Sequence, residues 1–96
     1  MLTANNWNVC QYAVLVHMMA QVSGLEAGEL VHVISDAHIY ERHIPIVKEI
    51  IKHKQYKAPK FVIDKSIKDF YAFSVDSFKF ENYKFNDKKY KIEVAI

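Results

Sequence analysis

The residues best suited to chemistry lie together in residues 35–40, a stretch that follows β-branched side chains and leads into a helical pattern. If this stretch is extended, His38 and Tyr40 project from the same face of a strand end. A neutral imidazole beside a phenol both donates and accepts hydrogen bonds, which suits the hydroxyl group of a sugar. Alternatively, both rings are ordinary strand-end side chains packed over the next helix. The pattern alone leaves both interpretations open.

A second polar candidate, Asn8, lies where a long apolar run begins. Its carboxamide donates and accepts at once, so it complements the edge of uracil, on which an N–H lies beside a carbonyl. The competing interpretation is that Asn8, or its neighbour Asn6, simply caps the start of a helix. In either case we expect the side chain at the mouth of that helix.

Nucleophile and metal chemistry have weaker support. Cys10 is the only cysteine, and a thiol with histidines available as bases is a candidate nucleophile. It lies in an apolar helical run, however, where cysteine usually packs as a small hydrophobe, so we interpret Cys10 as structural. The five histidines show neither the His-x-x-x-His spacing nor an HExxH motif. We therefore expect no metal site.

The composition indicates a single modest domain covering residues 1–96, with 51% hydrophobic and 14% aromatic residues. A chain of this length buries only about 60–65% of its unfolded surface, so its stability alone would be marginal. Thirteen basic and eleven acidic side chains are interleaved, without the basic block that marks a nucleic-acid partner. The single cysteine fits a reducing compartment, and the apolar run is too short to cross a bilayer. We expect a cytoplasmic protein without a membrane partner.

The elements that must position these residues begin with residues 9–22, which predict a helix that is apolar on nearly every side. Such a helix is typical of the buried centre of a protein. Ser23 and Gly24 are expected to end it. Because 96 residues can hardly surround this helix, we expect another copy of the chain to supply part of its cover.

The remaining pattern predicts an α+β (mixed α/β) fold, with the central buried helix and an amphipathic helix packed on a sheet. Residues 30–34 read as a strand buried on both faces, and residues 60–63 as a short strand. Apolar residues at helical spacing from Ile44 predict the amphipathic helix, with Pro45 in its first turn. A brief helical turn is expected to start at Ser66. Residues 78–81 and 89–94 alternate apolar and charged side chains, so each is expected to be a strand or an extended arm with one wet face.

A set of ordered motifs extends over the whole chain. They are Asn6-Trp7-Asn8-Val9-Cys10-Gln11-Tyr12, His17-Met18-Met19-Ala20-Gln21, Gly28-Glu29-Leu30-Val31-His32-Val33, Asp36-Ala37-His38-Ile39-Tyr40 with His43, Ala58-Pro59-Lys60-Phe61, Asp69-Phe70-Tyr71, Glu81-Asn82-Tyr83 and Val94-Ala95-Ile96. With these motifs the chain resembles the C-terminal portion of thymidylate synthase, a folate-dependent enzyme, essentially from end to end.

The resemblance implies methylation of deoxyuridine monophosphate (dUMP) to dTMP. The co-substrate 5,10-methylenetetrahydrofolate would supply both the carbon and a hydride, and the intact enzyme would be a homodimer. In the family, the residue that corresponds to Asn8 recognises the pyrimidine base. The residues that correspond to His38 and Tyr40 bind the 3′-hydroxyl of the deoxyribose. The implied substrate residues are Asn8, His38, Ile39 and Tyr40. The implied folate residues are Trp7, Lys91, Val94 and Ala95, the last two in a tail that closes over the folate.

Departures from the family pattern are as informative as the matches. The family's nucleophilic cysteine lies in an upstream Pro-Cys-His segment, and Cys10 does not match it. The upstream Arg-Ser-x-Asp run and the phosphate-clamping arginines of the partner subunit are also missing, so no catalytic residue is expected in this chain. We therefore expect a fragment of a larger thymidylate synthase, or a truncated reading frame, that cannot complete the reaction alone. Near the end, Asn86-Asp87-Lys88-Lys89 replaces a Pro-His-Pro stretch and Glu93 replaces a usual proline.

Two alternatives stay open. A related deoxycytidylate hydroxymethylase would carry a carboxylate at the position of Asn8, able to accept from the cytosine amine, so Asn8 favours uracil. The other alternative is a non-catalytic remnant that merely assembles, because its apolar helix lacks cover.

Overall fold

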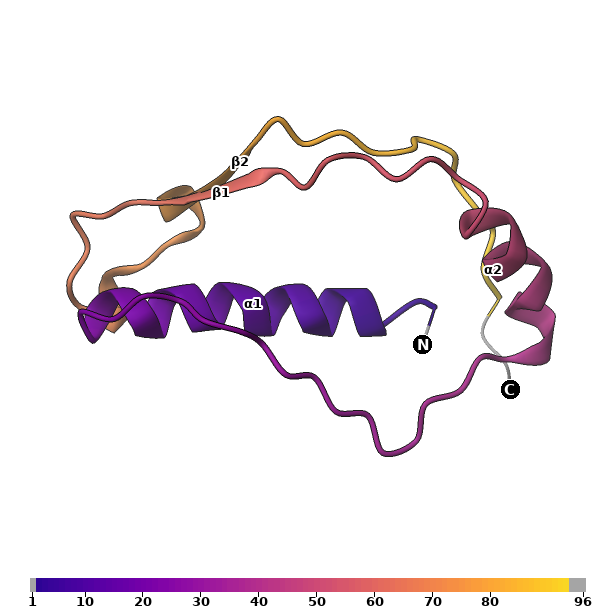
Figure 1. The fold of residues 1–96 in the computed structure, drawn as a ribbon, viewed down its shortest axis with the longest axis horizontal. Coiled ribbons are helices and arrows are strands. Elements are labelled where there is room, and N and C mark those ends of the chain that lie inside the picture. The colour runs from indigo at the N-terminus through magenta and orange to yellow at the C-terminus, as the bar shows by residue number, and fades with distance from the viewer. Residues whose placement is uncertain (1, 94–96) are drawn as a thin grey trace.

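The chain runs from a long helix through a short helix and a two-stranded sheet to a C-terminal arm, in a computed structural model that describes residues 2–93 (Figure 1). The helices and strands are α1 (Asn5–Val22), α2 (Ile44–Ile50), β1 (Lys60–Ile63) and β2 (Phe78–Glu81), with 3₁₀ turns at Glu41–His43, Phe70–Ala72 and Val75–Ser77. This mixed arrangement confirms the predicted α+β class.

Helix α1 begins at Asn5, with Ala4 in the N-cap position and no capping side chain. The prediction that Asn6 or Asn8 caps the helix is therefore wrong, because both lie inside it. The end agrees with expectation: Ser23 is the C-cap, and Gly24 follows at a φ of 71°, the left-handed conformation that glycine adopts without a steric penalty.

The apolar surface of α1 is largely bare. No α1 residue is buried by the rest of residues 2–93, and Trp7, Tyr12 and Met19 are 75%, 52% and 51% exposed. The central burial expected for this helix is therefore not provided by the described residues, among which only His43 and Ser77 are buried. Cover for an apolar helix of this kind has to come from outside them.

The expected strand at residues 30–34 is wrong, because this segment has no regular secondary structure and forms part of the loop from α1 to α2 (Figure 1). Val31 and Val33 are 78% and 84% exposed. A strand buried on both faces needs neighbouring strands along its edges. The sheet of the described residues contains only β1 and β2, which pair with each other.

Strand β1 confirms the predicted short strand at residues 60–63, and β2 shows that residues 78–81 form a strand rather than an extended arm. The two strands pair antiparallel, with Lys60 opposite Glu81 and Ile63 opposite Phe78. The ring of Phe61 lies 5.9 Å from that of Phe78 and 5.5 Å from that of Phe80. The centroid of the His17 ring, on α1, lies 4.9 Å from that of the Phe61 ring. These ring contacts attach α1 to the sheet.

Helix α2 confirms the predicted amphipathic helix, with Pro45 in its first turn, and ends at Ile50. It lies at the opposite end of the molecule from the sheet, so it does not pack on β1 and β2 as expected (Figure 1). The turn expected at Ser66 begins instead at Phe70, because the Asp64 carboxylate accepts hydrogen bonds from the amide and hydroxyl of Ser66. These bonds lower the Asp64 pKa and hold an Asx turn where the helical turn was expected. Residues 82–93 form an arm without a strand.

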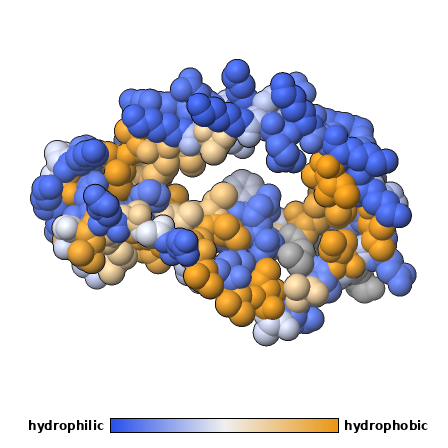
Figure 2. All heavy atoms as spheres, viewed as in Figure 1, coloured by the Kyte–Doolittle hydropathy of each residue, from blue (hydrophilic) through white to orange (hydrophobic). Residues whose placement is uncertain are grey.

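The chain surrounds an opening. Its radius of gyration is 16.6 Å, against about 13 Å for a compact domain of this length. Figure 2 shows the central opening, with hydrophilic side chains on the upper rim. Hydrophobic side chains gather over the loop between α1 and α2 and over α2.

Replacing Phe61 with alanine should lower the free energy of unfolding by about 2 kcal/mol, less than for a fully buried phenylalanine because Phe61 is only half-buried. Urea titration followed by circular dichroism measures the loss. Phe85→Ala is the matched control, because Phe85 is 61% exposed and, among residues 2–93, its ring contacts only that of Tyr83. Equal losses in the two variants would contradict the proposed attachment of α1 to the sheet.

Candidate functional site

The predicted ring pair is present, although it lies on an irregular loop rather than at a strand end. The rings of His38 and Tyr40 have centroids 5.4 Å apart and an interplanar angle of 42°. The His38 Nδ1–H donates to the carbonyl oxygen of Asp36 (3.1 Å), and the Asp36 carboxylate lies 3.7 Å from the same nitrogen. In this tautomer Nε2 is left as an acceptor for a ligand hydroxyl. Tyr40, 41% exposed, adds a phenol beside it.

Asn8 lies in the first turn of α1, where its backbone amide donates to the carbonyl of Ala4 (3.1 Å). Its side chain is exposed and has no hydrogen-bond partner among residues 2–93. The carboxamide of Asn8 is therefore available to both an acceptor and a donor of a ligand.

An open cavity of about 290 Å³ brings the start of α1 to the ring-bearing loop. Its lining comes from three segments and consists of Leu2, Asn5, Asn6, Ile39 and Val47. A hydrogen bond between Asn5 Oδ1 and His32 Nε2 (3.1 Å) fastens the same loop to the first turn of α1. The structure thus brings Ile39 to the start of the helix that carries Asn8. No hydrogen bond joins Asn8 itself to either ring in the described part of the chain.

The predicted folate residues lie on separate segments. Trp7 is 75% exposed on α1, and Lys91 lies on the arm, where its Nζ is 3.8 Å from Glu93 Oε1. Val94 and Ala95 lie outside the described residues. Trp7 and Lys91, the two predicted folate residues in the described part of the chain, are therefore exposed.

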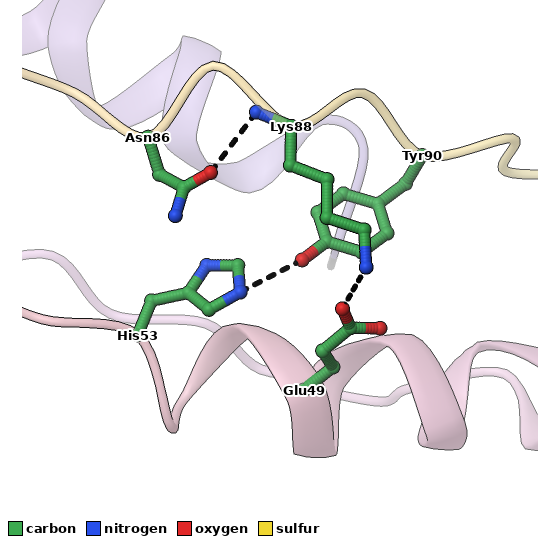
Figure 3. Close-up of polar contacts among 5 residues, drawn as sticks. All are labelled: Glu49, His53, Asn86, Lys88 and Tyr90. Atoms are coloured by element: carbon green, nitrogen blue, oxygen red, sulfur yellow. Dashed lines mark hydrogen bonds and ion pairs between the residues drawn. The ribbon is translucent and has the colours of Figure 1, made fainter.

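A set of contacts that was not predicted from the sequence attaches the arm to α2 and the turn after it, as Figure 3 shows. Lys88 Nζ forms an ion pair with Glu49, and the Tyr90 hydroxyl is hydrogen-bonded to His53 Nε2 (3.1 Å). Asn86 Oδ1 accepts from the backbone amide of Lys88 (2.9 Å) and so shapes the arm locally. One feature of the sequence could have indicated these contacts. Glu49 and His53 are four residues apart, a spacing that places two side chains on one face of a helix, and their partners Lys88 and Tyr90 are two residues apart, a spacing that places them on one face of an extended arm.

The ion pair sets a pH range for the arm. The hydrogen bond and charge of Lys88 lower the Glu49 pKa from its ordinary 4.5, and Glu49 raises the Lys88 pKa from 10.5. The contribution of Glu49 is complete above pH 4.5 and is lost as the pH falls through its lowered pKa. The contribution of Lys88 to stability is complete below its ordinary pKa of 10.5 and is lost as the pH rises through its raised pKa.

Acidification below pH 4.5 should therefore increase the mobility of residues 86–93. Because both side chains are about half exposed, the effect should be small. Heteronuclear ¹H–¹⁵N NOE values across an acid titration measure it. In Glu49→Gln, the arm should already show this small increase in mobility at neutral pH and should show no acid step near this range. An unchanged step would assign it to another group.

Cys10 and a metal site were the remaining candidates for chemistry. Cys10 is a free, exposed thiol on α1, so the described residues do not provide the packing expected for it. Among residues 2–93, no group of three His, Cys, Asp or Glu side chains is arranged to hold a metal ion. No helix in that same range is long and apolar enough to span a membrane.

Comparisons with known proteins agree over the entire chain. The sequence profile of the family described as thymidylate synthase matches residues 1–96. Thymidylate synthases of Bacillus licheniformis and Bacillus phage phi3T are 48% and 47% identical over 96 residues, all of this chain and 34% of each relative. The solved structure of thermostable thymidylate synthase A from Bacillus subtilis superposes with a TM-score of 0.92 at 46% identity, over 98% of this chain and 34% of that one.

The fold and these comparisons define a transferase family of nucleotide biosynthesis. The chain belongs to the thymidylate synthase family, as its resemblance predicted. It spans about a third of the length of the relatives that it matches.

Proposed function

We propose that this chain forms part of the dUMP- and folate-binding site of a thymidylate synthase, which methylates dUMP with 5,10-methylenetetrahydrofolate. The family match over all 96 residues is the observation that carries this proposal. The local structure is consistent with it, because Asn8 exposes a carboxamide and the rings of His38 and Tyr40 lie side by side, and these are the residues that the resemblance implies for nucleotide contacts.

In the proposed site, Asn8 pairs with the uracil edge, donating to a carbonyl and accepting from the ring N–H. The rings of His38 and Tyr40 hold the 3′-hydroxyl of the deoxyribose, and Ile39 packs beside them. The folate lies on the side of Trp7, Lys91, Val94 and Ala95. The folate co-substrate supplies the one-carbon group and a hydride, and the nucleophile that attacks the uracil ring comes from outside these residues.

Calorimetric titration of the chain with dUMP and dCMP tests this function. Because a carboxamide complements uracil, dUMP should bind and dCMP should bind at least tenfold more weakly, the order of one mismatched buried polar pair. Preferential binding of dCMP would favour the hydroxymethylase alternative. Binding of neither nucleotide would favour the non-catalytic remnant, which the lack of buried apolar side chains among residues 2–93 also fits.

We further propose that the chain works in the cytoplasm, because its single cysteine fits a reducing compartment. We also propose that it forms a homo-oligomer, because α1 exposes apolar side chains such as Tyr12, Leu15 and Met19. Sedimentation velocity should then show dimers or larger species. The double variant Leu15→Glu with Met19→Glu should shift the chain towards monomer, because two charges would have to be buried in the contact. A monodisperse wild-type monomer would contradict the oligomer.

A further inference from the structure

His43 is the one buried titratable group in the described part of the chain. Its residue is 5% exposed, and Ser77 is the only other buried residue among residues 2–93. It is the last residue of the 3₁₀ turn Glu41–His43, contacts the arm, and is not part of the ring pair assigned to the sugar. A buried imidazole in a chain with so little burial needs specific partners, because an unpaired polar group away from water is costly.

One partner of His43 is the arm. The His43 Nε2–H donates to the backbone carbonyl oxygen of Glu93 at 2.6 Å. The bond spans fifty positions of the sequence and ends two residues after Lys91, a proposed folate contact. Lys91 and Glu93 also line a small cavity of about 110 Å³ together with His43. The imidazole therefore fixes the backbone of the arm at the level of the folate residue.

The other partner of His43 is the nucleotide loop. Its ring centroid lies 5.3 Å from that of Tyr40, which in turn lies 5.4 Å from that of His38. The His43 backbone amide also donates to the Tyr40 carbonyl oxygen (2.9 Å). Three rings thus form a continuous row that begins at the proposed sugar contact and ends at the arm.

We infer that His43 is a positioning residue that links nucleotide binding to the placement of the arm, an inference that rests on the proposed function. A sugar hydroxyl bound by His38 and Tyr40 fixes the Tyr40 ring. The fixed ring restrains the His43 imidazole against it, and the imidazole holds the Glu93 carbonyl. Binding of dUMP should therefore order residues 91–93, the segment that carries the folate contact Lys91.

The test compares ¹H–¹⁵N NOE values of residues 91–93 with and without dUMP, using calorimetry on the same samples. In the wild type, saturating dUMP should raise these values. His43→Phe keeps an aromatic ring beside Tyr40 but loses the donor, so without ligand the arm should detach roughly 2- to 10-fold more often, the worth of one net hydrogen bond. It should still bind dUMP, but the NOE values of residues 91–93 should no longer respond.

His43→Gln provides the conservative comparison, because its amide can still donate to the Glu93 carbonyl. It should restore the attachment of the arm, but not its response to dUMP, since the ring contact with Tyr40 is gone. His53→Gln is the matched control: it removes the other histidine that holds the arm, at Tyr90, and should loosen the arm while leaving the response at residues 91–93.

Each outcome decides one step. Equal NOE values in unliganded wild type and His43→Phe would show that His43 does not hold the arm. A normal dUMP response in His43→Phe would overturn the coupling through the rings. If calorimetry detects no dUMP binding to the wild type, the proposed function and the coupling both fail, whereas the attachment of the arm is still judged from the unliganded spectra.

Discussion

Replacing Asn8 with aspartate should exchange the nucleotide preference of the chain, weakening dUMP roughly 10- to 100-fold and strengthening dCMP, because an unpaired buried polar group costs about 1–3 kcal/mol. A carboxylate only accepts hydrogen bonds. With aspartate, the uracil carbonyl would face another hydrogen-bond acceptor, whereas the cytosine amine could donate to the carboxylate. Calorimetric titration of the variant with both nucleotides gives the ratio of their affinities.

The control for Asn8→Asp is Gln11→Glu, which adds the same charge one turn later on α1. If charge alone matters, both variants should weaken both nucleotide monophosphates by similar factors, through repulsion of the phosphate. If Asn8 reads the base, only Asn8→Asp should change the dUMP to dCMP ratio. A ratio that stays at the wild-type value in Asn8→Asp would remove this residue from base recognition.

The second large effect concerns turnover. The 96-residue chain alone should release no tritium from C5-tritiated dUMP in the presence of 5,10-methylenetetrahydrofolate, because its only thiol is not the family's nucleophile. Co-expression with the part of the Bacillus licheniformis relative that lies outside the 34% matched here should supply that nucleophile and restore turnover. It should also supply cover for α1.

The variant Cys10→Ser shows whether Cys10 or a cysteine of the added segment is the nucleophile in that experiment. Cys10 is exposed on α1, so serine should leave the restored turnover within about twofold, the usual effect of a surface substitution. Turnover by the chain alone, or its abolition in Cys10→Ser, would make Cys10 the nucleophile and contradict the assignment.

The elements that the sequence predicted well depend on local signals. The apolar run gives α1, and the alternation of Phe78 and Phe80 with charged residues gives β2, because each pattern reports its own period. The strand predicted at residues 30–34 was wrong because its formation depends on contacts that are not local. The β-branched composition of these residues reports a preference for burial, whereas strand formation depends on neighbouring strands that a local pattern does not contain.

The candidate site divides in the same way. The pairing of His38 and Tyr40 follows from their i, i+2 spacing, and it survives on an irregular loop. The bond from His43 to Glu93 and the ion pair of Glu49 with Lys88 join positions 50 and 39 residues apart. Their formation depends on the path of the arm, which no periodicity encodes. The N-cap prediction for Asn8 failed because α1 starts before it, without a capping side chain.

The opening enclosed by the chain has a thermodynamic consequence. Trp7, Val31 and Val33 are at least 75% exposed, so whatever fills the opening and covers α1 removes much apolar surface from water. Such burial gives a large negative change in heat capacity. Assembly should therefore become steeply more exothermic as the temperature rises. A preformed compact chain that gained only a few surface contacts would show a nearly constant enthalpy.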